Sequence, residues 1–546
     1  MRATIKRLPS IVWKGIEPNL RYFLSSRQPL VWLLANIIGL CVGVAAILFR
    51  LAIGLFQLPW LGTMSERVAT AAAATPWYVI LLAPAFGGLI VGIILQRFMS
   101  GDRPLAVADV IEARVLGGRR LTFRQGMWTT LVHSVSLGFG ASAGREGPVV
   151  HLGAVLSESF CRLMRITGVP EKTLIACGVA SAVSASFNAP IAGVLFAHEV
   201  ILGHYAMSAF VPIVIASVVG GIVSRLYFGE VAAFTVPEYA INSYLEVPAF
   251  ALLGLTCAAV AIIFQFALMG TEYTARSVKM PLWLRPVLGG LMVGAIGVFF
   301  PDILGVGYDT TDKALQGSLA ISTLFALLFA KTAATAITLA SRLGGGIFSP
   351  SLYLGAMTGG AFGLIAASVF PDIASGNGVY AIIGMGAVAA AVLGAPISTT
   401  VIVFELTGGY ALTLALLFTV SIAVGITFAV HGRSWFHWQL ETRGLFVSEG
   451  PHRYLIGTVR VRDFLEPLPP EKREEAEPFD PGGGEPYLRP ADTLEAALRT
   501  FDSSGASTVP VVSPDDATKV IGHVSQIRAL RYFNRALIRQ SEEEHR

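Results

Sequence analysis

The chain has 546 residues, of which 54% are hydrophobic and 14% are charged, with a formal net charge of +4 and a mean hydropathy of +0.64. Soluble domains carry about 25% charged residues, so this composition excludes an ordinary soluble protein and predicts one that crosses a membrane several times. The small net charge does not suggest a nucleic-acid-binding surface, and no nucleic acid is expected as a partner.

The first apolar run covers residues 29–49 and contains no charged side chain. It matches the length of about 20 residues that a helix needs to cross the hydrocarbon core. It is too long for the core of a signal peptide, and no small-residue cleavage site follows it, so we expect a retained helix. Residues 1–28 precede it, and positive charge beside a first span favours the cytoplasm. Their basic residues are Arg2, Lys6, Arg7, Lys14, Arg21 and Arg27.

Further apolar runs follow, and together they assign residues 29–450 to a transmembrane domain. These runs cover residues 77–95, 247–270, 287–300, 318–330, 378–404 and 411–430. The four cysteines lie in apolar segments without the spacing of metal ligands, so we interpret them as small core residues. No metal and no cofactor are expected.

Two sequence blocks, PxxxLGA and API, occur twice in the same order and at nearly the same offset. The blocks start at Pro148, Ala189, Pro350 and Ala395, and a glutamate follows each API block, Glu199 and Glu405. One match would carry little weight in a chain rich in Gly and Ala, but two ordered matches predict an internal duplication, as in many transporters. We place the halves at about residues 29–230 and 247–431. The equivalent positions of the two glutamates suggest a structural role near helix ends.

Each repeated block contains a proline after small residues, a pattern that predicts a helix beginning with proline at its first position. The beginning of a helix carries positive partial charge and free N–H donors, and it binds anions without a basic side chain. Several such helix starts meeting within the membrane would form an anion pathway, whereas a cation pathway needs rings of carboxylates or carbonyls. Ordinary helix starts at the bilayer surface are the alternative.

Glu146 stands out within the sequence GREGP, because long stretches with few charges flank it. An ionisable side chain inside a membrane usually has a functional role. The alternatives are a charge on a surface loop and a partner in an ion pair.

The character of the chain changes toward the C terminus. Residues 466–487 are rich in Pro, Gly and acidic residues, which indicates a solvated linker or loop. An amphipathic helix, a strand at residues 509–512, a turn and a strand at residues 520–524 are expected after it. Residues 451–546 therefore form a cytoplasmic region with a small α/β module.

GREGP, GGIFSP, the FNAP block with its Glu199, and SWFHWQLETRGL followed by VRVRDFL resemble the CLC family of chloride channels and chloride/proton antiporters. The resemblance covers roughly residues 29–530 and is to the bacterial form with a C-terminal CBS extension. It implies an all-α polytopic membrane protein built from two inverted repeats of tilted and broken helices. It also implies a homodimer in the bacterial inner membrane, with both termini cytoplasmic and one pore in each subunit.

The resemblance further implies that chloride or a similar anion rests on backbone amides of two loops. The residues at these positions are Arg145, Glu146, Gly147, Ile347, Phe348 and Ser349. Glu146 is then the gating glutamate, since a carboxylate among anion-binding N–H groups can itself occupy the outer anion site. Protonation neutralises the carboxylate and frees the site. A nearby bound anion disfavours the ionised carboxylate, which couples proton and anion occupancy.

The sequence departs from the family pattern at three positions. Leu105 stands where the family has the serine of the central anion site, and Phe436 stands where it has the tyrosine. Both side-chain donors of the central site are therefore missing. Val200 replaces the inner glutamate that passes protons in the antiporters, and His198 is either a substitute proton relay or a packed histidine. Both a passive channel and a proton-coupled antiporter remain open.

The C-terminal module resembles a single CBS unit, in which an aspartate would contact the ribose of a nucleotide. Arg528 occupies that position, so nucleotide binding is not expected, and a regulatory or dimer-contact role is favoured. The histidines of the apolar region lie on separate segments without an HExxH motif, so we expect no enzymatic activity. A stand-alone sensor is a further alternative, which anion flux through a chain ending near Gly450 would separate from a transporter.

Overall fold

The computed structural model describes residues 13, 15–21, 23–117, 121–229, 234, 241, 243–447, 450–469, 479–481 and 483–545. The chain divides into two compact units, Met1–Trp435 and Phe436–Arg546. Part of the N-terminal basic segment, including Arg2, Lys6, Arg7 and Lys14, lies outside the described residues. Residues 470–478 and 482 of the predicted acidic loop also lie outside them.

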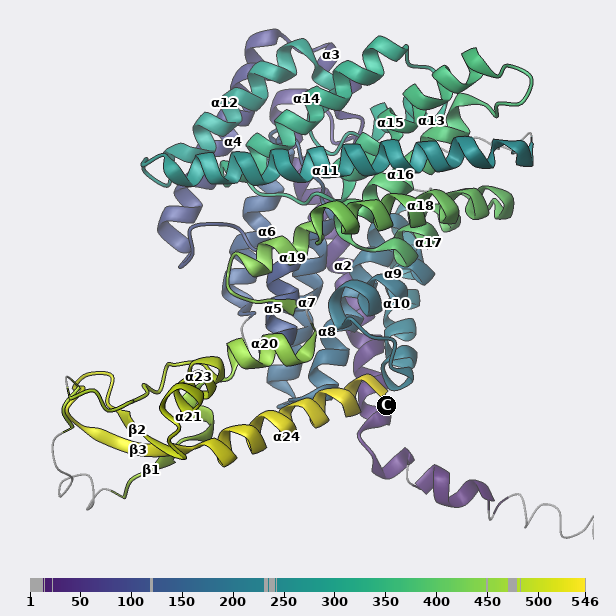
Figure 1. The fold of residues 1–546 in the computed structure, drawn as a ribbon. Helices are drawn as coiled ribbons and strands as arrows, with labels where there is room; N and C mark the ends of the chain where they lie inside the picture. Colours follow the sequence, from purple (N-terminus) through teal and green to yellow (C-terminus); the bar gives the residue numbers. More distant parts are fainter. Residues whose placement is uncertain are drawn as a thin grey trace, which may run out of the picture. The chain divides into compact units, whose positions relative to one another are not determined.

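Within its described residues, the first unit consists of helices joined by loops, and its first half begins with a long apolar helix. The elements of this half are α2 (Gln28–Leu61), α3 (Val68–Ala73), α4 (Trp77–Phe98), α5 (Val107–Leu116), α6 (Phe123–Gly138), α7 (Glu146–Leu163), α8 (Val169–Phe187), α9 (Pro190–Phe196), the π-helix η1 (Ala197–Leu202) and α10 (Met207–Phe228). Helices α7, α8 and α10 lie side by side, with α8 in contact with the other two (Figure 1).

The second half of this unit repeats the same order of helices. Its elements are η2 (Tyr244–Glu246), α11 (Val247–Ser277), α12 (Leu284–Phe299), η3 (Pro301–Ile303), α13 (Tyr308–Leu315), α14 (Ile321–Ala340), α15 (Phe348–Val369), α16 (Asn377–Leu393), α17 (Pro396–Thr407) and α18 (Tyr410–His431). Helix α15 packs against α16 as α7 packs against α8.

The repeated LGA block explains how these helix pairs pack. A Cβ atom on Gly153 would collide with the backbone of Gly178 in α8, and one on Gly355 would collide with the backbone of Gly384 in α16. Glycine therefore lets the two backbones approach closely, as small residues do between membrane helices. The same contact at equivalent positions supports the predicted duplication.

Within the described residues, seven helices are long and apolar enough to cross a membrane. The run at residues 378–404, predicted as one apolar stretch, consists of two helices. Helix α16 ends at Leu393 and is capped by Gly394, whose φ of 68° is in the left-handed region, and α17 begins at Pro396. A proline lacks the N–H that would continue the earlier helix, so the chain turns here although its hydropathy does not change.

The position of two prolines differs from the prediction. Helix α7 begins at Glu146 and α15 at Phe348, so Pro148 and Pro350 are third in their helices and not first. Proline fits there equally well, because the N–H groups of the whole first turn have no partner within the helix. The prolines at the start of α9 and α17 are first, as predicted.

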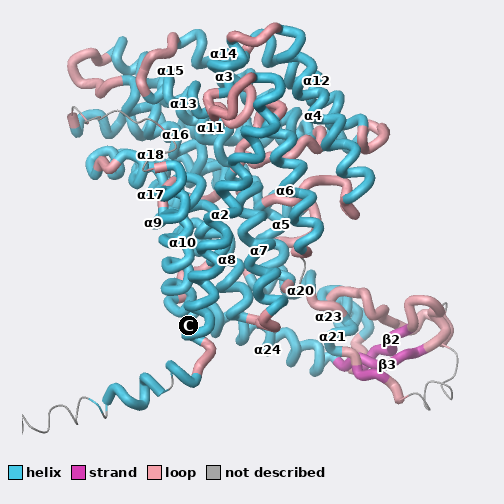
Figure 2. Tube along the Cα trace, turned by 180° about the vertical axis from the view of Figure 1, so that it is seen from behind, coloured by secondary structure: helices cyan, strands magenta, loops and turns pink. Residues whose placement is uncertain are grey.

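The second unit combines helices with a small sheet, whose strands β2 and β3 are visible in Figure 2. Its elements are α19 (Trp435–Glu441), which starts at the boundary, α20 (Pro451–Thr458), α21 (Val461–Phe464), β1 (Glu466–Pro467), α23 (Leu494–Ser504), β2 (Thr508–Val512), β3 (Val520–Ser525) and α24 (Gln526–His545). The strand order is β1-β3-β2, with both pairs antiparallel.

The core of this unit buries apolar side chains from helices and strands, including Phe464, Phe501 and Val509. The predicted helix and its two following strands are confirmed as α23, β2 and β3. The prediction of a linker from residue 466 is wrong for its first two residues, because they form β1 against β3. The long helix α24 was not predicted.

Candidate functional site

The loops that precede α7 and α15 lie against each other. The backbone N–H of Gly144 donates to the carbonyl of Gly346 across 2.7 Å, and the N–H of Gly346 donates back across 2.7 Å. This antiparallel pair joins the GREGP and GGIFSP motifs, which are far apart in the sequence. The six residues predicted to surround an anion, 145–147 and 347–349, are therefore brought together at two helix beginnings, where the first amides lack partners within the helix.

Two glycines allow this loop pair to form. Gly345 has a φ of 126°, a region that side chains other than glycine rarely adopt. A Cβ atom on Gly345 would collide with the side chain of Ala143. Gly344 has a φ of 94°, and a Cβ atom there would lie 3.2 Å from Pro104. The loop that carries Leu105 is thus also adjacent.

Glu146 lies at this junction with only 1% of its surface exposed. The hydroxyl of Tyr308, the first residue of α13, donates to Oε1 of Glu146 across 2.5 Å. The guanidinium of Arg145 approaches the same oxygen at 4.0 Å and lies over the Tyr308 ring, 5.0 Å from its centre. Oε2 has no hydrogen-bond partner in the described part of the chain. The carboxylate is therefore held on one oxygen by residues from both halves.

Tyr308 is not among the site residues predicted from the sequence. The internal repeat could have indicated Tyr308, because α13 is the second-half equivalent of α5. Tyr308 begins α13, directly after the loop that is equivalent to the Leu105 loop before α5. A search for polar side chains at positions equivalent to the Leu105 loop would have found this tyrosine.

Lys331 is a second residue that the sequence analysis missed. It lies within α14 and is completely buried. Its ammonium group donates to the carbonyls of Ile303 and Gly305, at 2.9 Å each. Lys331 thereby fixes the loop that leads into Tyr308. Lys331 directly follows the apolar run predicted at residues 318–330. A charged residue at the end of an apolar run was the sequence pattern that could have indicated it.

The loop of Leu105 is fixed by polar contacts on both sides. Asp109 accepts two bonds from the Arg103 guanidinium, at 3.0 and 2.6 Å, and one from the N–H of Ala106 at 2.7 Å. The Leu105 carbonyl accepts a bond from Nε2 of His133 at 2.9 Å. The Leu105 side chain is half-buried and offers no hydrogen-bond donor.

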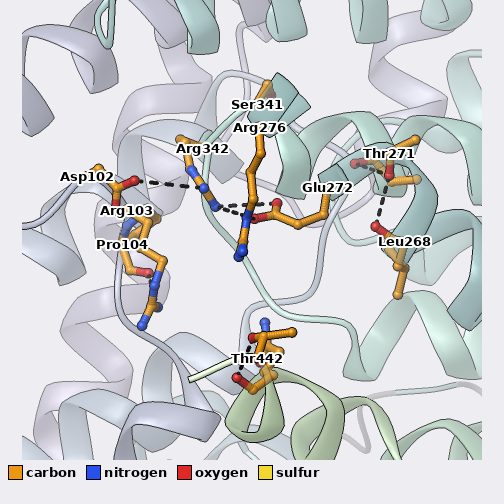
Figure 3. A network of polar contacts seen from close by, with 12 residues as sticks. Asp102, Arg103, Pro104, Leu268, Thr271, Glu272, Arg276, Ser341, Arg342 and Thr442 are labelled. Carbon is orange, nitrogen blue, oxygen red and sulfur yellow. Dashed lines mark hydrogen bonds and ion pairs between the residues drawn. The ribbon is translucent and has the colours of Figure 1, made fainter. Parts of the chain in front are cut away.

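Arg342 connects this loop with the segment before GGGIFSP (Figure 3). Its guanidinium lies 3.9 Å from Asp102 and 3.0 Å from Glu272 of α11, which also pairs with Arg276 at 2.8 Å. Arg342 has a φ of 67°, an uncommon conformation for a residue other than glycine. The network thus anchors the segment preceding one motif loop to the segment preceding Leu105.

Glu199, which follows α9, binds the beginning of α17, and Glu405 of α17 binds the beginning of α9. Glu199 accepts the N–H groups of Ile397 and Ser398 at 2.9 and 2.8 Å. Glu405 accepts those of Ile191 and Ala192 at 3.0 and 2.7 Å. A carboxylate is stabilising at a helix beginning, so the structural role predicted for these two residues is confirmed.

A family model for the voltage gated chloride channel matches residues 87–427. The chain belongs to the voltage-gated chloride channel family. A putative chloride channel protein, ClcB-like, from Ralstonia nicotianae is 31% identical over 388 residues, which cover 70% of this chain and 90% of the relative. The voltage-gated ClC-type chloride channel ClcB of Escherichia coli is 30% identical over 73% of this chain and 96% of its own.

Solved structures of CLC proteins share the fold. A slow cyanobacterial Cl⁻/H⁺ antiporter superposes with a TM-score of 0.68 at 23% identity, over 76% of this chain and 97% of its own. A eukaryotic CLC transporter superposes with a TM-score of 0.65 at 19% identity, over 93% of this chain and 90% of its own. This degree of identity supports the fold and does not by itself assign a substrate.

The remaining predicted positions of the CLC pathway carry no carboxylate. Val200 is a half-buried residue of η1. His198 is buried, its Nδ1 lies 2.9 Å from the carbonyl of His204, and its ring stacks on Tyr205. This environment is that of a packed histidine. Phe436 is buried in α19 and belongs to the second unit.

Proposed function

We propose that this protein transports chloride or similar small anions across a membrane, with Glu146 as the gate. The observation that carries the proposal is the buried carboxylate of Glu146 at the junction of two motif loops, where α7 and α15 begin. Helix beginnings favour anions, so the ionised carboxylate and a transported anion compete for the same amides. Membership of the CLC family and the chloride-channel names of its relatives support this reading.

The gate closes when Glu146 is ionised and opens when it is protonated. In the closed form, Tyr308 donates to Oε1 and Arg145 places positive charge 4.0 Å from it. Protonation removes the negative charge, so the amides of residues 145–147 and 347–349 become available to an anion. Because Leu105 offers no hydroxyl, backbone amides supply the binding at its position.

The domain boundaries, the oligomeric state and the membrane topology are proposed from the resemblance to the CLC family. Residues 29–450 form the transport domain as two inverted halves, and two copies associate as a homodimer in the bacterial inner membrane. Both termini lie in the cytoplasm. Residues 451–546 form a CBS-like region with a regulatory or dimer-contact role, and Arg528, which pairs with Glu466 at 2.7 Å, disfavours nucleotide binding.

Proton coupling separates the two variants of this function. Val200 offers no carboxylate to receive protons from Glu146, and the packing of His198 does not favour a relay, so we propose a channel with a pH-sensitive gate. A chloride/proton antiporter is the alternative, supported by the fold shared with a Cl⁻/H⁺ antiporter. Reversal potentials in liposomes under a proton gradient at fixed chloride should follow chloride alone. Uphill proton movement would establish the antiporter, and its loss in His198→Ala would identify the relay.

Glu146→Gln tests the gate. Glutamine resembles the protonated carboxyl group, so anion efflux from liposomes should persist and lose most of its pH dependence. Glu158→Gln is the matched control, because Glu158 is a buried glutamate of the same helix that accepts the N–H of Leu121. An unchanged pH profile in Glu146→Gln would contradict the gate.

A further inference from the structure

A pocket of about 380 Å³ lies directly beside the gate residues. Its lining includes Arg50, Glu66, Arg145, Tyr308 and Asp312. Arg145 and Tyr308 are the two residues that hold Glu146, so the pocket adjoins the gate. It lies at the side of the first unit where α2 ends, which is the extracellular side under the proposed topology.

The carboxylate of Glu66 is enclosed by two arginines within this pocket. Arg50 of α2 approaches both carboxylate oxygens, with Nε and Nη2 each at 2.8 Å. Arg145, at the start of α7, forms an ion pair with Oε1 of the same carboxylate. A carboxylate bound by two guanidinium groups marks a position with the charge and donors to hold a small anion.

The two arginines are held by contacts other than Glu66. The Arg50 guanidinium lies 3.9 Å from the ring centre of Phe228. Arg145 is only 4% exposed, and its Nη2 donates to the carbonyl of Ser186 at 3.4 Å. Glu66, by contrast, belongs to the loop between α2 and α3, and 29% of its side chain is exposed. Arg50 thus lies on a helix and Arg145 lies immediately before one, whereas Glu66 lies on a loop.

We propose that the space between Arg50 and Arg145 is an additional anion-binding site, in which the Glu66 carboxylate occupies the position of a small monovalent anion. This inference rests on the proposed function, because it supposes that halide-sized anions enter the pocket. Removing the charge of Glu66 leaves Arg50 without its carboxylate partner and the buried Arg145 with Glu146 alone, and a free anion restores the balance. An anion here would share the Arg145 guanidinium, which lies 4.0 Å from the Glu146 carboxylate.

Bromide soaked into crystals of the full-length protein tests the site through anomalous diffraction. Wild-type crystals should show no peak between Arg50 and Arg145, because Glu66 fills the position, and Glu66→Ala crystals, in which the position is vacated, should show one. Asp312→Asn removes the same charge from the same pocket without vacating the position between the arginines, so it should show no peak there. Absence of the peak in Glu66→Ala would overturn the site.

Calorimetry on the purified full-length variants provides a second measurement. Bromide should bind Glu66→Ala about tenfold more tightly at this site than it binds the wild type, a difference of about 1.4 kcal/mol. Adding Arg50→Gln should abolish that gain. An equal gain in bromide affinity in Asp312→Asn would overturn the site, because the gain would then come from a general change in the electrostatic potential of the pocket. Failure of the proposed function would instead appear as loss of anion efflux from wild-type liposomes, whatever the bromide result.

Discussion

Replacing Tyr308 by phenylalanine removes one hydrogen bond from the gate. The Tyr308 hydroxyl donates to Oε1 of Glu146 across 2.5 Å, and both side chains are buried. Phenylalanine keeps the ring and deletes only the donor. A hydrogen bond to a charged group contributes about 1.5–3 kcal/mol, and one pH unit corresponds to about 1.36 kcal/mol. The pH of half-maximal anion flux should therefore shift by about 1–2 units.

The shift should be upward, because the bond stabilises the ionised and closed form of the gate. Without it, protonation and opening occur at higher pH, and flux at neutral pH increases. Chloride efflux from liposomes, measured over a series of pH values, gives the profile. Tyr380→Phe is the control, since the Tyr380 hydroxyl donates to a different buried carboxylate, that of Glu246, at 2.7 Å. Identical profiles for Tyr308→Phe and the wild type would refute the reasoning.

Two further substitutions test the supports around the gate. Lys331→Met leaves the carbonyls of Ile303 and Gly305 without their buried donor, so the free energy of unfolding in detergent should fall by about 1–3 kcal/mol. The pH of half-maximal anion flux should also shift upward, as in Tyr308→Phe. An unchanged pH of half-maximal flux would contradict the idea that Lys331 positions Tyr308 through this loop. Glu405→Gln removes a charge from the beginning of α9 and should lower stability by about 0.3–2 kcal/mol. The decrease in melting temperature should be the same in Glu405→Gln and Glu199→Gln, and the pH dependence of anion flux should be unchanged in both variants. A change in that pH dependence would mean that these residues take part in gating.

The features that the sequence predicted are those set by local chemistry and composition. Low charge and long apolar runs predict membrane helices, because lipid admits backbone only when its polar groups are paired internally. Prolines after small residues located the beginnings of α9 and α17, since proline is favoured at the first position of a helix. The internal duplication could also be predicted from the sequence, because equivalent helix pairs need glycine at equivalent contacts, Gly153 and Gly355.

The features that only the tertiary structure decided are contacts between residues far apart in the chain. The pairing of Gly144 with Gly346, the bond from Tyr308 to Glu146, and the position of Glu66 between two arginines each join different helices or loops. No periodicity or propensity encodes which polar side chains meet, because that depends on how all the helices pack at once. The sequence by itself thus predicted a gating role for Glu146 and an anion site at two loops, whereas the contacts of Glu146 with Tyr308 and Arg145 became visible only when the two halves were brought together.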